Sequence, residues 1–252
     1  MEKNKLNISW CYPDMLNLHG DRGNVMALKK VGELLGLDVN INKVETYGTK
    51  IDFENTDILL FNVGELKLCQ KLIDVLNTQE TEFRNYIESG KMIIAIGTTG
   101  TIFGKEINRA DGTKIEGFGF FDMSCTEREM VYGNDIIFKL QEDPSIEIVG
   151  NQIQMIDIKL NDASSALGNV EYGWGNDGSD QKLEGAKYKN LIFTNALGPV
   201  LVKNPWYTEK LIKDAMYVKG IELQNSVNNE EYELERNSMK AIKEYTKNKV
   251  NM

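Results

Sequence analysis

The feature that most constrains the fold is a regular alternation of strand-like and helical segments in the first hundred residues. Apolar strand patterns lie at residues 5–13, 38–45, 57–64 and 92–97. Apolar residues recur at helical spacing at 24–36, where Gly36 ends the helix, and at 65–88. This alternation is typical of βαβ units, whose parallel strands form one sheet covered by helices.

The second half of the chain has a different pattern. Segments that read as strands joined by Gly, Asn and Asp turns lie at 114–123, 130–140, 146–160, 169–177 and 187–197. Two helices follow, one at 206–220 with Thr208 as its expected N-cap and one at 228–248. No repeat or Pro/Gly-rich linker divides the sequence. We therefore expect one α/β domain over residues 1–252, with a parallel central sheet and additional antiparallel strands in its C-terminal half.

Composition and charge argue against several classes of protein. A net charge of -9 with interspersed signs disfavours binding to nucleic acid or to an anionic membrane surface. No apolar run approaches the roughly 20 residues that span a bilayer, and the N-terminus lacks the apolar segment of a signal peptide. Three cysteines without a C-x-x-C pair suggest reduced thiols and no metal. We expect a cytoplasmic protein with neither metal nor cofactor.

The segment KMIIAIGTTGTIFGKEI, at 91–107, reads as a strand, a sharp turn and a helix. In α/β enzymes such a turn often exposes a nucleophile at the end of a parallel strand. The residue at this bend is Gly97, which has no side chain. Thr98 and Thr101 carry hydroxyls, but a threonine nucleophile needs a base, and His19 is the only histidine in the chain. We therefore favour helix-capping roles for both threonines.

Two long segments of the sequence resemble a known family. CYPDMLNLHGDRGNVMALKK, at 11–30, and GWGNDGSDQKLEGAKYKNLIFTNALGPVLVKNP, at 173–205, are similar to the glutaminase subunit of lipid II isoglutaminyl synthase. ADGTKIEGFGFFD, at 110–122, extends the similarity. The resemblance implies a cobyric-acid-synthase-like class I glutamine amidotransferase with a flavodoxin-like, three-layer fold. It also implies release of ammonia from glutamine for a Mur-ligase-like partner that amidates a peptidoglycan precursor.

The catalytic positions of that family are replaced in this chain. The family's nucleophile turn, of the form A-I-C-G-G, matches Ala95 to Thr99 and puts the cysteine at Gly97. Its general-base segment, G-T-Y-L-H-G-P, matches residues 193–199 and puts the histidine at Leu197. Glycine has no atom that could attack an amide, and leucine cannot transfer a proton. The resemblance therefore implies a family member that lacks glutaminase activity.

Two further parts of the family's pocket also differ. The Gly-rich turn that supplies backbone N–H groups to the oxyanion keeps only Gly64, within LLFNVGELKLCQ. A family segment of Asn-His-Gly-Gly character reads GNQIQMIDI at 150–158. The residues that we expect at the equivalent of the family pocket are Gly64, Gly97, Thr98, Thr101, Gln154 and Leu197.

The loop before the first helix contains more polar residues than a strand–helix connection needs. One interpretation is a turn in which Gly23 or Asn24 caps the helix, while Asp21 and Arg22 are solvated. The other is contact with a partner subunit or the pocket rim, because ligands bind at this end of a parallel sheet. The candidate residues are Asp14, Asn17, Asp21, Arg22 and Asn24.

Three functions are compatible with these residues. We favour a catalytically inactive amidotransferase-like subunit that acts as a structural or regulatory partner of a Mur-ligase-like synthetase. The second is a stand-alone module that binds a small anion or an amino acid. The third is an active glutaminase with a displaced nucleophile, for which Cys125 has the most polar surroundings of the three cysteines.

Overall fold

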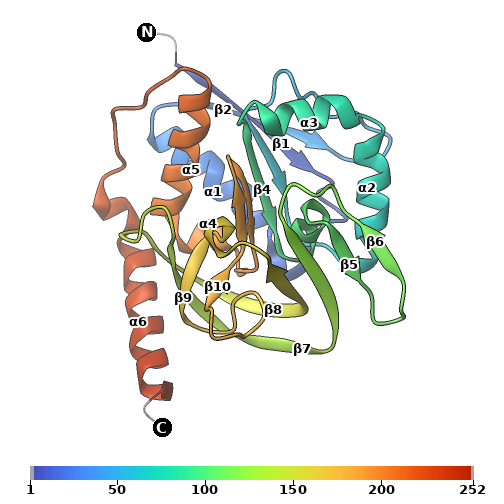
Figure 1. The fold of residues 1–252 in the computed structure, drawn as a ribbon. Coiled ribbons are helices and arrows are strands. Elements are labelled where there is room, and N and C mark those ends of the chain that lie inside the picture. The colour runs from blue at the N-terminus through green and yellow to red at the C-terminus, as the bar shows by residue number, and fades with distance from the viewer. Residues whose placement is uncertain (1–2, 251–252) are drawn as a thin grey trace.

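The first of two sheets is parallel except at one edge. The computed structural model describes residues 3–250, and its first sheet has the strand order β11-β12-β4-β3-β1-β2 (Figure 1). Its strands are β1 (Lys5–Cys11), β2 (Asp38–Val44), β3 (Ile58–Phe61), β4 (Met92–Ile96), β11 (Ala186–Tyr188) and β12 (Leu191–Thr194). Only the edge strand β11 runs antiparallel to its neighbour. The predicted parallel sheet is confirmed.

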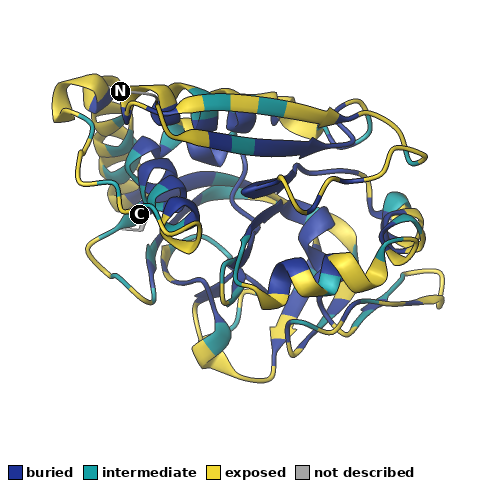
Figure 2. Ribbon diagram, turned by 90° about the horizontal axis from the view of Figure 1, so that it is seen from above, coloured by how far each residue is buried: buried dark blue, intermediate teal, exposed yellow. Residues whose placement is uncertain are grey.

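Helices cover both faces of this sheet and bury its alternating side chains. The helices α1 (Arg22–Leu34) and α5 (Pro205–Val218) lie on one face, and α2 (Cys69–Asn77) and α3 (Glu80–Glu88) lie on the other (Figure 1). In β3, Leu59 belongs to the cluster with α2 and α3, whereas its neighbour Leu60 belongs to the cluster with α1 and α5. Strands buried on both faces are uniformly apolar because helices cover both sides, and Figure 2 shows the buried strands between helices with exposed outer surfaces.

The second sheet is mostly antiparallel and is dominated by one long hairpin. Its strands follow the order β10-β9-β7-β5-β6, and β8 pairs with β7. They are β5 (Glu106–Asn108), β6 (Lys114–Glu116), β7 (Met123–Leu140), β8 (Glu147–Leu160), β9 (Gly168–Tyr172) and β10 (Leu183–Glu184). The register between β7 and β8 shifts between Glu127 and Tyr132. These are the additional antiparallel strands that the second half of the sequence predicts.

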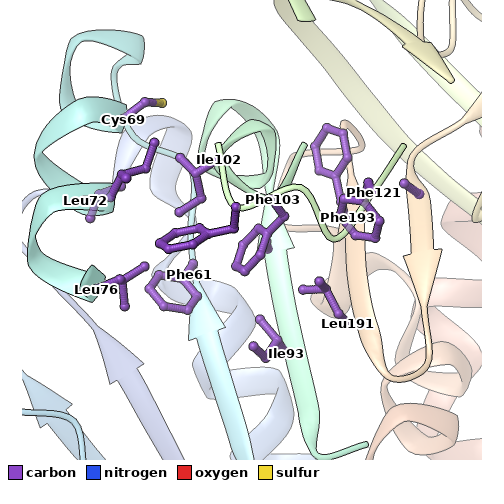
Figure 3. Close-up of a cluster of buried hydrophobic side chains, with 14 of the residues drawn as sticks. Phe61, Cys69, Leu72, Leu76, Ile93, Ile102, Phe103, Phe121, Leu191 and Phe193 are labelled. Atoms are coloured by element: carbon purple, nitrogen blue, oxygen red, sulfur yellow. The ribbon is translucent and has the colours of Figure 1, made fainter. Parts of the chain in front are cut away.

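An aromatic-rich cluster joins the second sheet to the first. Phe103 lies 6.2 Å from Phe61 and 6.3 Å from Phe121, measured between ring centroids. Phe121 lies 6.5 Å from Phe193 in β12 by the same measure. Figure 3 shows these rings packed with Leu72 and Leu76 of α2. The segment after β4 is therefore held from both sides by apolar contacts, which fixes the position of the candidate site.

Short helices and one long helix complete the fold. The 3-10 helices are Leu18–Gly20, Leu66–Leu68, Gly97–Phe103, Ala163–Ser165 and Asn229–Tyr232, and the remaining α-helices are α4 (Val200–Lys203) and α6 (Glu233–Val250). Among the helices of residues 3–250, none has both the length and the apolar character needed to cross a membrane.

The single helix predicted at 65–88 is wrong, because the chain forms two helices there. The backbone of Gln79 leaves the helical region, with φ -131° and ψ 36°. Its side-chain amide accepts a hydrogen bond from the N–H of Ile51 at 2.9 Å and donates one to the Ile51 carbonyl at 3.0 Å. This contact with a distant loop interrupts the helix, and no local pattern could reveal it.

The two predicted helix N-caps, Thr208 and Asn24, are also wrong. The helix α5 begins at Pro205, a residue suited to the first helical turn. Thr208 therefore lies inside α5, where its hydroxyl donates to the Leu201 carbonyl at 2.8 Å. The helix α1 begins at Arg22, so Asn24 lies within the helix rather than before it. The helix α1 ends at Leu34, and Gly36, with φ +86°, follows its C-cap and closes the helix as predicted.

Candidate functional site

The strand β4 runs directly into the 3-10 helix Gly97–Phe103. Gly97 has φ +62°, a left-handed conformation that glycine adopts without a Cβ penalty. A Cβ on Gly97 would lie 2.6 Å from Val63 Cγ2 and 3.4 Å from Leu197 Cδ2. The place that a side chain would need is therefore already occupied by Val63.

Leu197 lies across from Gly97 because its backbone is bound to β8. Leu197 and Asn151 form an isolated antiparallel bridge, with N–H to carbonyl distances of 2.8 Å and 3.0 Å. Gly150 makes this close approach possible, since a Cβ there would lie 2.8 Å from the Ala196 Cβ. The Leu197 side chain is 2% exposed. An apolar group thus fills the position opposite the glycine.

Hydroxyl groups join the loop after β3 to the turn after β4. The Gly64 N–H donates to Thr99 Oγ1 at 3.2 Å, and the Thr98 hydroxyl donates to the Gly64 carbonyl. The Thr99 hydroxyl in turn donates to the Asn62 carbonyl at 2.8 Å. Both backbone polar groups of Gly64 therefore have partners within the protein.

The expected helix-capping roles of Thr98 and Thr101 are wrong. No side chain caps the N-terminus of the 3-10 helix Gly97–Phe103. The Thr101 hydroxyl donates to the Thr98 carbonyl at 2.6 Å, and the Thr98 hydroxyl reaches the neighbouring loop. The approach of the loop after β3, which lies far from the turn in sequence, gives the Thr98 hydroxyl an acceptor that a local pattern does not contain.

Gln154 lies at the site, and its amide is used by the protein itself. Its Nε2 donates to the carbonyls of Ile156 and Asn176 at 2.7 Å and 2.8 Å. Its Oε1 accepts from the Nε2 of Gln152 at 2.7 Å. The side chain of Gln154 therefore ties β8 to the loop after β9.

Only a small inner cavity remains beside Gly97. Its volume is about 10 Å³, close to the minimum that holds one water molecule. It is lined by Gly97, Thr98, Thr101, Ile153, Gln154, Met155, Ile156 and Asn195. A larger pocket of about 490 Å³ shares Thr98, Ile153 and Met155 with this cavity and also reaches Gly64. Five of the six residues that we expected at the pocket equivalent line one of these two cavities, and the sixth, Leu197, lines neither but lies against Gly97.

The polar residues of the loop before α1 do not line either cavity. The residues of that loop that reach the larger pocket are Leu18 and His19. Asp14 and Arg22 form an exposed ion pair at 3.0 Å, an arrangement that contributes little to stability. None of the five residues that we expected at a pocket rim lines either of these cavities, and their contact with a partner subunit stays a prediction.

Asp21 is buried, so its expected solvation is also wrong. Its side chain is 0% exposed, and Oδ2 accepts a hydrogen bond from the Val63 N–H at 3.2 Å. Burial raises the pKa of Asp21 to about 6. Asn24 is also buried, and its Oδ1 accepts from the Leu201 N–H at 2.9 Å. Asp21 thus holds Val63 in its place against Gly97.

The partly buried Asn17 makes no side-chain contact that assigns it a role at this site.

Glu184, which the sequence analysis missed, supports the segment before Leu197. Its Oε1 accepts hydrogen bonds from the Thr194 hydroxyl at 2.8 Å and from the Asn195 N–H at 2.7 Å. The side chain is 0% exposed, and burial raises its pKa to about 7. Nothing in the local sequence distinguishes this glutamate from a solvated one.

The cysteine closest to the turn is not the one that the sequence suggested. The Cys69 Sγ lies 3.6 Å from the Thr98 carbonyl oxygen and 3.8 Å from Thr101 Oγ1. Burial raises the pKa of Cys69 to about 11. Cys125 is 0% exposed, and burial raises its pKa well above the ordinary range, so the reactive surroundings expected for it are wrong. Both are thiols at neutral pH.

The described residues offer no evident metal site. Within residues 3–250, no group of three or more His, Cys, Asp or Glu side chains is placed to hold a metal ion. The three cysteines are free and buried.

Comparison with solved structures identifies the fold. A crystal structure of a glutamine amidotransferase matches with a TM-score of 0.54 and 12% identity, over 82% of this chain and 98% of that one. PurLQS from Thermotoga maritima matches with a TM-score of 0.52 and 14% identity, over 86% and 97% of the two chains. These matches confirm the expected class I glutamine amidotransferase fold.

Comparison with known sequences identifies the family, although no protein-family model matches the chain. The chain is 31% identical over 218 residues to the lipid II isoglutaminyl synthase (glutamine-hydrolyzing) subunit GatD of Staphylococcus aureus (strain N315), covering 86% of this chain and 87% of the relative. It is 29% identical to the corresponding subunit of Streptococcus pneumoniae (strain ATCC BAA-255 / R6), over 85% and 82% of the two chains. This chain therefore belongs to the family of GatD subunits of lipid II isoglutaminyl synthase.

Proposed function

We propose that this chain is an amidotransferase-like subunit without glutaminase activity, and that it acts as a structural or regulatory partner of a Mur-ligase-like synthetase. The observation that carries the proposal is the pairing of Gly97 with Leu197 at the turn after β4. A Cβ on Gly97 would lie 3.4 Å from Leu197 Cδ2, so the two residues face each other. Neither has an atom that could attack an amide or transfer a proton.

The neighbouring polar groups also argue against hydrolysis at this turn. Stabilising an oxyanion requires an N–H group that is free to donate, yet the Gly64 N–H already donates to Thr99 Oγ1. The amide of Gln154 is likewise used within the protein. In hydrolases of the nucleophile–base type, loss of either group lowers the rate by several orders of magnitude.

A displaced cysteine nucleophile is disfavoured by burial. Cys69 is close enough to the turn to be considered, but it is 1% exposed and its pKa is raised to about 11. A thiol attacks an amide as its thiolate, which would be scarce at neutral pH. The other cysteines are equally buried.

The family relationship supports a role in an assembly. Both relatives are named as subunits of a synthase. The chain matches each of them over more than four fifths of its length, whereas the positions that the resemblance assigns to the nucleophile and the base hold Gly97 and Leu197. Retention of the scaffold without the chemistry is expected where the surface of the protein, rather than its pocket, is what a partner requires.

A direct assay tests the absence of activity. Purified protein would be incubated with glutamine, and ammonium would be measured by a coupled dehydrogenase assay, with the Staphylococcus aureus relative as the positive control. We expect no release above the uncatalysed background, alone or with the synthetase added. Release that disappears in Cys69→Ala or Thr98→Ala would contradict the proposal.

Partnership needs its own measurement. The chain would be co-expressed with the Mur-ligase-like synthetase of the same cell, and complex formation would be measured by size-exclusion chromatography with light scattering. We expect a stable complex whose formation is unchanged by Gln154→Ala. A monomer at all concentrations would instead favour the stand-alone binding module.

A further inference from the structure

The larger pocket next to the candidate site has the size and walls of a small-molecule site. Its volume of about 490 Å³ lies within the usual range for such sites. Apolar side chains form much of its wall, and several remain exposed: Val131 is 53% exposed, Ile153 43%, Met155 40% and Leu18 36%. Neighbouring apolar groups that stay exposed in this way often mark a binding surface.

One sheltered ion pair lies in this pocket. Arg109, directly after β5, donates from Nε to Glu127 Oε2 in β7 at 2.8 Å, and the two side chains are 20% and 15% exposed. The Ala110 N–H also donates to Glu127 Oε2 at 2.9 Å. These bonds lower the pKa of Glu127 and raise that of Arg109, so both groups are charged at neutral pH.

The ion pair leaves hydrogen-bonding capacity unused. A guanidinium has five N–H donors, and a carboxylate has two acceptor oxygens. In residues 3–250, the only side chain bonded to the Arg109 guanidinium is Glu127, through Nε, and Glu127 Oε1 has no hydrogen-bond partner. The pocket therefore offers charged donors beside a charged acceptor.

We propose that this pocket binds a free apolar α-amino acid. Its α-carboxylate accepts from the Nη groups of Arg109, its α-ammonium donates to Glu127 Oε1, and its side chain lies on the apolar wall. The remaining acid–base pair in the pocket, Glu65 and Lys67, is paired at 2.6 Å, so the lining of the pocket carries no net formal charge. A zwitterion satisfies both members of an ion pair, whereas a simple anion or cation would meet one like charge.

The walls favour an apolar side chain over that of glutamine. A carboxamide on this wall would lose its hydration without finding partners, which is unfavourable. Among the other polar lining residues, Thr98 bonds to Gly64 and Glu65 pairs with Lys67, and within residues 3–250 only the side chain of His19 forms neither a hydrogen bond nor an ion pair. This inference goes beyond the proposed function. The larger pocket could bind an amino acid whether or not glutamine is hydrolysed beside Gly97.

Ligand comparison on the unaltered full chain tests the proposal. Leucine, methionine, glutamine, leucinamide and 4-methylpentanoate would be titrated by isothermal calorimetry. We expect leucine and methionine to bind. Leucinamide and 4-methylpentanoate each lack one charged group, so they should bind at least about tenfold more weakly, the cost of one charge-assisted hydrogen bond. Glutamine should also bind more weakly than leucine.

Variants locate the site. Arg109→Gln and Glu127→Gln should each weaken leucine binding by at least about tenfold. Arg84→Gln is the matched control, because Arg84 pairs with Glu80 at 2.8 Å outside the pocket, and it should leave affinity unchanged. If a pocket variant fails to fold, the ligand comparison still decides the matter. Failure of leucine to bind, or equal affinity for leucine and leucinamide, would overturn this inference alone, whereas ammonia release from glutamine would overturn the proposed function alone.

Discussion

Gly97 and Leu197 face each other, with only 3.4 Å between the position of a Cβ on Gly97 and Leu197 Cδ2. They follow the carboxyl ends of two adjacent parallel strands, Gly97 directly after β4 and Leu197 shortly after β12. Parallel neighbours bring their carboxyl ends to the same edge of a sheet, which is where α/β proteins build their sites. The fold thus brings together the two positions that the resemblance assigns to a nucleophile and a base, and neither Gly97 nor Leu197 has the required chemistry.

Substitution of Gly97 by alanine should destabilise the protein by about 2–4 kcal/mol. One part of the cost is the left-handed backbone at φ +62°, and the other is the collision with Val63 at 2.6 Å. Gly36→Ala is the control, because Gly36 also has positive φ but has no atom within 4 Å of its Cβ position. Urea unfolding should give a larger loss for Gly97→Ala. Equal losses would show that Val63 yields without cost.

Placing a cysteine at position 97 and a histidine at position 197 should not create glutaminase activity. In Gly97→Cys/Leu197→His, the new thiol would compete with Val63 for space, and the Gly64 N–H would still donate to Thr99 Oγ1. Loss of one oxyanion donor lowers turnover by about 100- to 1000-fold. We expect ammonia release from glutamine to stay far below that of the Staphylococcus aureus relative. Comparable rates would mean that the polar contacts described here rearrange easily.

Glu184 should make stability depend on pH. Burial raises its pKa from 4.5 to about 7, so the folded protein binds this proton more tightly than the unfolded chain. The contribution of this bound proton to the free energy of unfolding is complete below pH 4.5. It declines as the pH rises toward 7 and is lost above pH 7. Glu184→Gln removes the ionisation, so it should be more stable than wild type at pH 8, by up to about 3 kcal/mol.

The difference in unfolding free energy between Glu184→Gln and wild type, measured at several pH values, tests this prediction. Unfolding free energies measured at pH 5, 6, 7 and 8 should show the advantage of Glu184→Gln growing with pH. Glu88→Gln is the control, because Glu88 is a half-exposed glutamate on the surface. A constant difference between Glu184→Gln and wild type would contradict the raised pKa.

Asp21 should tolerate asparagine better than alanine. Asparagine keeps an oxygen that accepts from the Val63 N–H and removes a buried charge, so Asp21→Asn should be close to neutral at pH 7. Alanine leaves that N–H buried without a partner, which costs about 1–3 kcal/mol. Chemical denaturation of both variants measures the contrast. Similar stability of the two would show that the hydrogen bond to Val63 contributes little.

Local patterns were sufficient for the architecture. Apolar patterns located the parallel strands of the first half and the first helix, because burial imposes a pattern that is visible within a short segment. They did not show that β12, in the second half, joins the parallel sheet beside β4. The resemblance to known amidotransferases located Gly97 and Leu197, since the order of the segments along the chain is itself sequence information. The break at Gln79 and the start of α5 were missed because each depends on a contact with a distant segment.

What the sequence by itself determined about this protein is its α/β framework and the residue types at the turn after β4. Only the tertiary structure decided which polar groups are free. The Gly64 N–H, Asp21 and Glu184 look ordinary in the sequence. Gly64 and Asp21 acquire their partners from segments more than 30 residues away, and Glu184 of the second sheet acquires its partner from β12 of the first sheet. Hydrogen bonding and desolvation depend on which segments meet in space, and that information is absent from any short stretch of the chain.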